Sequence, residues 1–260
     1  MKRTQIRSSG IAIRQDFSEA VRFAFFETDF EEFRYATHGG TVFVVSFCGR
    51  VYALTCRHIF KDFESGKLFL TAEKMAKKGS KPAPVRALCY PSSPRDAAAE
   101  TDIIDVCVIE FSDDINADFF KGSAYIIDTN TVGTSKRGHR LLVAGVLKDK
   151  SQIIPPDIDV GYCILDFGDM GASTTDPILR HATAEFSNPQ FDNITGISGS
   201  PVYDETANVL CGMVVRGGMV QNICNIYYID IYDIVKFLTG VSNREGDVWY
   251  TKNVLLSVTT

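Results

Sequence analysis

One serine of this 260-residue chain has a sequence context that favours nucleophilic chemistry. Ser198 stands between Gly196-Ile197 and Gly199 in the segment TGISGSPVYD, and an apolar run follows. Glycines on both sides of a serine allow a sharp backbone turn that exposes the hydroxyl and directs main-chain N–H groups at one point. The pattern therefore predicts a nucleophile beside an oxyanion hole. A plain Gly-Ser turn fits the same letters, so the interpretation depends on finding partners for the serine.

The first partner that Ser198 requires is a general base, because a serine hydroxyl is a weak nucleophile near neutral pH. His58 ends the predicted strand VYALTCRH, where a β-barrel would hold its imidazole at a fixed site. His38 precedes a Gly-Gly turn and His139 lies in a loop with glycine and arginine, contexts that are typical of solvated histidines. His181 is the fourth candidate. We expect His58 to be the base.

The second partner is a carboxylate that holds the tautomer of the histidine and stabilises the imidazolium. Asp105 opens the apolar run DVCVIEF, where an unpaired acidic residue would be costly to bury. Asp102 is a rival, but it lies outside this run and its context is typical of a solvated loop acid. We therefore expect Asp105 to orient His58.

The elements that must position these residues are predicted to be strands. From Gly39 onward, short β-branched and aromatic runs alternate with turn residues, as in an all-β protein. Cys48-Gly49-Arg50 predicts a hairpin that pairs Thr41–Phe47 with Val51–Cys56, and Pro155–Asp159 is a candidate crossing between two small barrels. The predicted strands are TVFVVSF, VYALTC, KLFLTA, PVRALCY, DVCVIEF, RLLVAGVL, YCILDF, SPVYD, VLCGMVV and CNIYYIDI.

Both ends of the chain carry other patterns. Residues 14–38 have apolar positions at helical spacing with acidic residues between them, which predicts a helical cover before the main body. After Ile229, the run IYDIVKFLTGV predicts a helix that stops at Gly240. Residues 241–260 then add one or two strands.

Composition excludes several classes of protein. The net charge is −5 and no block of Lys or Arg is long enough to bind phosphates, so we expect no nucleic-acid partner. The apolar stretches are too short to cross a bilayer, so we expect no membrane insertion. The N-terminal segment has no continuous apolar region, which indicates a cytoplasmic protein. Seven scattered cysteines without a C-x-x-C pair read as buried thiols, with neither disulfides nor a zinc site expected.

Three motifs in the order His, Asp, Ser together resemble the chymotrypsin/trypsin-like serine protease family: GGTVFVV…LTCRHIF, DVCVIEF and TGISGSPVYD…VLCGMVV. They look most similar to the intracellular or bacterial branch, in which a threonine, here Thr55, precedes the histidine by three residues. The resemblance implies an all-β fold of two six-stranded antiparallel β-barrels with the active site between them. To this chymotrypsin-like core the sequence adds an N-terminal helical segment and a C-terminal helix.

The resemblance also divides the chain and assigns roles. Residues 1–38 are an N-terminal helical extension, 39–240 the protease domain with barrels at about 39–150 and 160–240, and 241–260 a C-terminal extension. The catalytic residues are then His58, Asp105 and Ser198.

Further roles follow from the same resemblance. The N–H groups of Gly196 and Ser198 form the oxyanion hole. Val215-Arg216-Gly217 pairs with the substrate backbone, and the stretch before the serine forms the pocket for the side chain that precedes the scissile bond. The partner is a polypeptide substrate, and neither a cofactor nor a metal is expected.

Departures from the family pattern concern specificity and activation. Asp192 has the spacing of the acid that selects Lys or Arg, although a plain loop carboxylate is the stronger interpretation. Arg216 replaces an aromatic residue of the family. Ile197 stands where secreted members have an aspartate that captures a new N-terminus, so control must come from a protein partner, an oligomer, loop ordering or constitutive activity. Ser200 and Arg57 are smaller departures.

Three functions therefore compete. The first is a serine endopeptidase that works through an acyl-enzyme. The second is a protease-like module that binds a peptide or protein with little or no turnover, which Ile197 and Ser200 favour and the complete triad opposes. The third is an esterase on the same triad.

Overall fold

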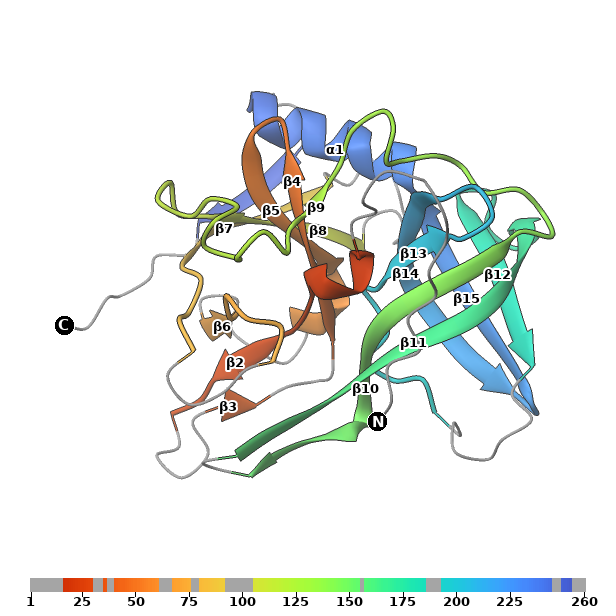
Figure 1. The fold of residues 1–260 in the computed structure, drawn as a ribbon, viewed down its shortest axis with the longest axis horizontal. Coiled ribbons are helices and arrows are strands. Elements are labelled where there is room, and N and C mark those ends of the chain that lie inside the picture. Colours follow the sequence, from red (N-terminus) through yellow and green to blue (C-terminus); the bar gives the residue numbers. More distant parts are fainter. Residues whose placement is uncertain are drawn as a thin grey trace, which may run out of the picture.

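The computed structural model describes residues 16–29, 35–36, 40–60, 67–75, 80–91, 105–154, 157–185, 193–244 and 249–253. Their fold is built almost entirely from antiparallel strands in two halves that pack side by side (Figure 1). The first half contains η1 (Phe17–Ala20), β1 (Val21–Phe23), β2 (Phe25–Glu27), β3 (Tyr35–Ala36), β4 (Thr41–Phe47), β5 (Arg50–Cys56), η2 (Arg57–Phe60), β6 (Leu68–Phe69), β7 (Val85–Pro91), β8 (Val106–Phe111) and β9 (Tyr125–Ile126). The second half contains β10 (Arg140–Ile154), β11 (Asp157–Ala172), β12 (Leu179–Glu185), β13 (Pro201–Asp204), β14 (Val209–Val220) and β15 (Ile223–Asp230), after which α1 (Ile231–Asn243) and β16 (Trp249–Asn253) follow.

The second half is a closed six-stranded barrel in the order β10-β11-β12-β15-β14-β13. Its interior is filled by apolar side chains that alternate with exposed ones along the strands, as the period of a half-buried strand requires. The expected all-β fold with a chymotrypsin-like barrel is therefore confirmed.

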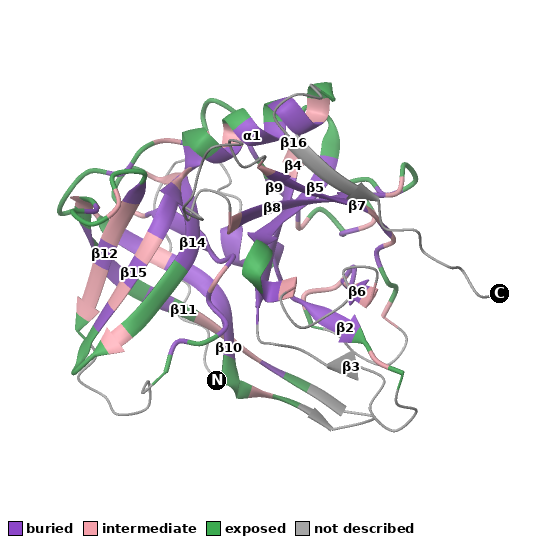
Figure 2. Ribbon diagram, turned by 180° about the vertical axis from the view of Figure 1, so that it is seen from behind, coloured by how far each residue is buried: buried purple, intermediate pink, exposed green. Residues whose placement is uncertain are grey.

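The first half is a seven-stranded sheet with the path β1-β4-β5-β8-β7-β16, which β9 joins through β4, and a separate three-stranded sheet β3-β2-β6. The predicted hairpin between β4 and β5 is present. Cys48 and Gly49 form its turn with φ values of 49° and 75°, which suit the right-handed twist of the two strands. The central strands β4, β5 and β8 are buried along most of their length (Figure 2).

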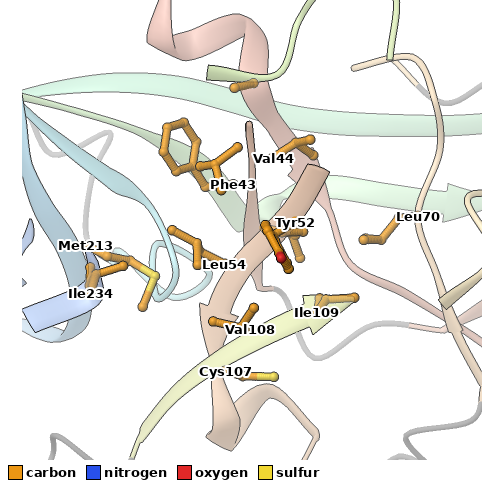
Figure 3. Close-up of a cluster of buried hydrophobic side chains, with 14 of the residues drawn as sticks. Phe43, Val44, Tyr52, Leu54, Leu70, Cys107, Val108, Ile109, Met213 and Ile234 are labelled. Carbon is orange, nitrogen blue, oxygen red and sulfur yellow. The ribbon is translucent and has the colours of Figure 1, made fainter. Parts of the chain in front are cut away.

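A continuous apolar core joins the two halves. Phe43 of β4 and Leu54 of β5 lie near Met213 of β14 and Ile234 of α1, so both halves and the helix contribute to one cluster (Figure 3). The relative placement of the halves, and of any site between them, is fixed by this packing.

The N-terminal segment differs from the helical cover that its spacing predicted. In its described part, η1 is a single short 3-10 helix and is followed by β1 and β2, of which β1 pairs with β4. All three residues of β1 are buried, so the alternation that would reveal a strand is missing from the sequence.

The crossing between the halves also differs from the expectation. Asp157 and Asp159 of the segment Pro155–Asp159 belong to β11 and pair with Ile154 and Gln152 of β10 within the second barrel, whereas Pro155 and Pro156 lie outside the described residues. The connection runs instead through residues 127–139, between β9 and β10. Residues 140–150, which we expected in the first barrel, therefore belong to the second.

The C-terminal helix is present as predicted but continues beyond Gly240, which is buried within it. It ends at Asn243, and Arg244 caps it with a left-handed backbone. After α1, β16 returns to the first half and pairs with β7. None of the helices in the described ranges is long and apolar enough to cross a membrane.

Candidate active site

His58 and Asp105 are in direct contact. His58 Nδ1 lies 2.6 Å from Asp105 Oδ2, and the backbone N–H of His58 donates to Asp105 Oδ1 over 2.9 Å. His58 lies in η2 just after β5, and Asp105 immediately precedes β8, which pairs with β5. Because a carboxylate accepts from Nδ1, the ring proton is placed on that nitrogen and Nε2 is the basic atom. The imidazole is 48% exposed, so a substrate can reach it.

The sharp turn predicted around Ser198 is present. Gly196 and Gly199 have φ values of +109° and +88°, which side-chain-bearing residues rarely adopt. A Cβ on Gly196 would lie 2.5 Å from the carbonyl oxygen of Val146, and one on Gly199 would lie 2.0 Å from that of Thr41. Both glycines are therefore required by backbone conformation and by close approach of the neighbouring chain.

Thr41, the first residue of β4, clamps this turn from the other half of the molecule. Its N–H donates to the carbonyl of Ser198 over 3.0 Å, and its hydroxyl donates to the carbonyl of Gly196 over 2.8 Å. Val146 N–H donates back to the same hydroxyl over 3.0 Å, and Thr55 holds the carbonyl of Thr41 over 2.7 Å. Sequence reasoning missed Thr41, because its partners are far away along the chain.

The N–H groups of Gly196 and Ser198 are the two expected oxyanion donors, and each belongs to a peptide group whose carbonyl accepts a hydrogen bond. The carbonyl of Thr195 accepts from Lys148 N–H over 2.8 Å, and the carbonyl of Ile197 accepts from Ser200 N–H over 2.9 Å. In a trans peptide the N–H points opposite to the C=O, so the N–H groups of Gly196 and Ser198 are turned to the other side. Within the described part of the chain, neither of these two N–H groups forms a hydrogen bond.

Ile197 anchors the turn by apolar packing. Its side chain is 2% exposed and belongs to the core of the second barrel together with Ile194 and Val202. An aspartate at this position would need a charged partner, whereas isoleucine needs only the core. The clamp by Thr41 and this packing therefore hold the turn without a captured N-terminus.

The hydroxyl of Ser198 donates to the carbonyl of Val215 over 3.4 Å, and no hydrogen bond joins it to His58 among the described residues. Cys56 Sγ lies 3.9 Å from the same carbonyl and 3.3 Å from that of Val214, so β14 meets the end of β5 here. Burial raises the pKa of the Cys56 thiol well above its ordinary value, and the charge of Asp105 raises it further. The contacts bring all three candidate catalytic residues to the junction of the two halves.

The expected substrate strand is an edge. Val215, Arg216 and Gly217 follow the point where β14 leaves β13; Arg216 and Gly217 pair with Tyr227 and Ile226 of β15, and Val215 lies in the bulge before them. An extended peptide can add to such an edge. The Arg216 guanidinium lies 4.9 Å above the ring of Tyr227, beside an open groove of about 520 Å³.

The space behind this edge is filled by two isoleucines. Ile194, in the stretch before the serine, and Ile226 of β15 are 4% and 0% exposed. A Cβ on Gly217 would lie 2.8 Å from Ile194 Cδ1 and 3.2 Å from Ile226 Cγ2. A deep pocket for a long side chain is therefore absent between these described segments. Asp192, the expected selector of Lys or Arg, lies outside the described residues, as do His38 and Asp102.

The remaining histidines have structural partners. His139 is not a solvated turn residue, because its Nδ1 lies 2.7 Å from the fully buried Asp204. His181 stacks on Tyr227 with ring centroids 4.8 Å apart and bonds to Asn225. Both rings are thus held on the second barrel.

Comparison with known proteins gives a match by structure only. No family model and no curated protein matches this sequence. Among solved structures, human heparin binding protein superposes with a TM-score of 0.58 at 12% identity, covering 90% of this chain and 96% of that one. The scabies mite inactivated protease paralogue S-D1 gives 0.59 at 8%, covering 90% and 95%. The thermostable serine protease AL20 from an extremophilic microorganism gives 0.53 at 12%, covering 87% and 98%.

These similarities define the fold class. The chain has the chymotrypsin-like double-barrel fold that is shared by trypsin-like serine proteases and by protease homologues. Because one similar protein is named a serine protease and another an inactivated paralogue, the fold by itself is compatible with catalysis and with its loss.

Proposed function

We propose that the protein is a serine endopeptidase that hydrolyses peptide bonds through an acyl-enzyme on His58, Asp105 and Ser198. The observation that carries this proposal is the 2.6 Å contact between His58 and Asp105 at the junction where the glycine turn of Ser198 is clamped by Thr41. A histidine with an oriented tautomer, next to a preorganised turn, is the arrangement that acyl transfer requires.

In the proposed mechanism, His58, Asp105 and Ser198 act once in the acylation step and once in the deacylation step. His58 Nε2 takes the proton of Ser198 as its hydroxyl attacks the scissile carbonyl, and the new oxyanion accepts hydrogen bonds from the N–H groups of Gly196 and Ser198. The imidazolium, stabilised by Asp105, then protonates the leaving amine. Water deprotonated by His58 releases the acyl group and restores the serine.

The proposed substrate is a polypeptide with a small side chain before the scissile bond. The backbone of the peptide adds to the edge of β14 at Val215–Gly217, and its side chain is directed towards Gly217. Because Ile194 and Ile226 fill the space there, Gly, Ala or Ser fits and Lys or Arg does not. The preference for basic residues that the spacing of Asp192 suggested stays a competing prediction, because Asp192 lies outside the described residues.

A fluorophosphonate probe with intact-mass readout tests the catalytic centre directly. We expect one adduct on the natural chain and none on Ser198→Ala. Ser200→Ala, two residues away and fully buried, is the matched control and should keep the adduct. Adduct formation on Ser198→Ala would refute the assignment of the nucleophile.

Peptide substrates that differ only in the residue before the scissile bond test the specificity. We expect kcat/KM for Ala to exceed that for Lys by about 10–200-fold, which is the discrimination that a poor fit of one side chain in an apolar pocket usually gives. Ile226→Ala should raise kcat/KM for larger residues, whereas Ile229→Ala, on the same strand but outside this cluster, should not. Equal use of Lys by the natural chain would contradict the filled pocket.

A binding module with little or no turnover is the second candidate. The hydrogen bond of Ser198 to Val215, in place of one to His58, favours it, and so does the similarity to an inactivated paralogue. If the natural chain takes up no probe, alone or with a partner, while it still binds peptides at the edge of β14, this candidate replaces the first. Ester substrates turned over without any amide cleavage would instead indicate an esterase.

The cytoplasmic location belongs to the same proposal and rests on the sequence, which also leaves activation by a protein partner open. The apolar anchoring of Ile197 supports constitutive activity over activation by a partner.

A further inference from the structure

A side chain that the proposed mechanism does not use lies against the dyad. Within the described residues, Cys56 Sγ, a ring nitrogen of His58 and a carboxylate oxygen of Asp105 all lie within 4.8 Å of one another. Cys56 ends β5, His58 follows in η2, and Asp105 precedes β8. No short motif of the sequence marks this cluster, because His58 and Asp105 are 47 residues apart along the chain.

The three donor types suit one metal in particular. A thiolate, an imidazole nitrogen and a carboxylate oxygen are all common zinc ligands, and three protein ligands with one open position is a frequent arrangement for Zn²⁺. The thiolate and the carboxylate together carry two negative charges, which neutralise the ion. A neutral complex lowers the cost of placing the ion beside the buried Cys56.

We propose that Cys56, His58 and Asp105 form an inhibitory zinc site within the candidate active site. The thiol proton goes to solvent when Cys56 becomes a thiolate ligand, so one proton is released for each ion bound. Ligand atoms around a tetrahedral zinc lie roughly 3.3–3.7 Å apart, given bond lengths of about 2.0–2.3 Å. His58 Nδ1 and Asp105 Oδ2, now 2.6 Å apart, therefore separate by about 1 Å, which the half-exposed imidazole can accommodate.

Inhibition follows from the tautomer of His58, and this step rests on the proposed function. A metal on Nδ1 displaces the proton that Asp105 now holds there. The neutral ring must then carry its proton on Nε2, the atom that has to accept the proton of Ser198. Zinc binding thus removes the general base without blocking the substrate edge of β14.

Cobalt titration tests the site without requiring activity. Co²⁺ is added to the full-length Ser198→Ala chain carrying Cys48→Ser, which removes an exposed thiol. We expect one bound ion with a thiolate-to-cobalt charge-transfer absorption that zinc displaces. Cys56→Ala should abolish the absorption, whereas Cys107→Ala, a buried thiol on the neighbouring strand β8, should keep it.

His58→Ala keeps the test decisive if Cys56→Ala fails to fold. It removes a half-exposed ligand and should weaken cobalt binding at least about tenfold, the lower end of the effect of losing even a supporting group of a metal ligand. Absence of the absorption from the parent chain, its survival in Cys56→Ala, or unchanged affinity in His58→Ala would each overturn the proposal.

A zinc titration of probe labelling tests inhibition. The natural chain should lose fluorophosphonate labelling as Zn²⁺ is added and regain it with a chelator, and Cys56→Ala should need at least about tenfold more zinc relative to its own metal-free rate. Labelling that is insensitive to zinc would overturn the inhibitory role. If the natural chain takes up no probe at all, the proposed protease function fails, while the cobalt absorption still decides the metal site.

Discussion

Two His–Asp pairs of nearly the same geometry lie in the described part of the chain. His58 and Asp105 are 2.6 Å apart, and His139 and Asp204 are 2.7 Å apart, each through Nδ1. The surroundings differ. The side chains of His58 and Asp105 are 48% and 20% exposed, whereas those of His139 and Asp204 are 25% and 0% exposed.

The two pairs also differ in what they connect. The pair of His58 lies where β14 of the second barrel contacts the end of β5 in the first half. The pair of His139 lies within the second barrel and ties the connection before β10 to the turn after β13, where Asp204 also accepts from Ala207 N–H. An oriented imidazole is therefore not sufficient for catalysis, because a nucleophile must approach it from another part of the fold.

Replacing each histidine gives the largest contrast. We expect His58→Ala to lower the rate of peptide hydrolysis about 10⁴–10⁶-fold, since it removes the general base. His139→Ala should leave that rate nearly unchanged and lower the free energy of unfolding by about 1–3 kcal/mol, because the buried Asp204 Oδ2 then loses the His139 ring and only Oδ1 keeps its bond from Ala207 N–H. Steady-state kinetics and denaturant unfolding measure the two effects. Comparable rate losses for both variants would break the comparison.

Replacing each aspartate separates orientation from packing. Asp105→Asn should cost about 10⁴-fold in kcat, because the amide favours the wrong tautomer of His58. Asp204→Asn should reduce thermal stability with little change in kcat. A full rate for Asp105→Asn would mean that the first pair, like the second, is only structural.

The pair of His139 and Asp204 is linked through the backbone of His139 to a buried ionic network, which we expect acid to weaken. His139 accepts a backbone bond from Asp169, and Asp169 accepts from Arg180 and Tyr228. Burial opposes ionisation, but the hydrogen bonds from Arg180 and Gly171 outweigh it and lower the pKa of Asp169 below its ordinary value of 3.8.

A lowered folded-state pKa means that this stabilisation is present above the ordinary value and is lost as the pH falls through the folded-state value. We expect the melting temperature to fall with acidification below about pH 4. Asp169→Asn should cost about 3–5 kcal/mol at neutral pH, because it strips Arg180 of its buried partner, and should flatten the acid dependence. Thermal unfolding across the pH range checks both, and an acid dependence as steep in Asp169→Asn would refute the assignment.

Weakening the clamp that Thr41 places on the turn of Ser198 should have the smallest effect on catalysis of these substitutions. Thr41→Val keeps the shape of the side chain but loses its bonds with Gly196 and Val146. We expect kcat to fall about 10–100-fold, less than for loss of an oxyanion donor itself, with little change in KM. Thr41→Ser should restore most of kcat. A rise in KM alone would indicate that Thr41 acts on substrate binding.

Local patterns predicted the parts of the fold that depend on neighbours in sequence. The turn at Cys48-Gly49 and the apolar run of β8 were sufficient to predict their strands. The pattern failed where a strand finds a distant partner: β1 is buried on both faces against β4 and was expected to be helical.

The same distinction applies to the candidate site. Residue types at strand ends predicted that His58 and Asp105 would meet, although their catalytic role is still a prediction. Thr41 bonds to Gly196 across 155 residues, and Ile226 packs behind Gly217 through the curvature of the barrel. No spacing in the sequence predicts these long-range contacts, because they depend on how strands that are distant along the chain pack once they have folded.

The pairing of β16 with β7 has a consequence for biosynthesis. Trp249–Asn253 covers an edge of a sheet whose other strands precede it by more than a hundred residues, so it leaves the ribosome well after them. Until Trp249–Asn253 has been synthesised, the edge of β7 is a template for pairing with other chains. Products truncated before Trp249 should therefore aggregate through this edge.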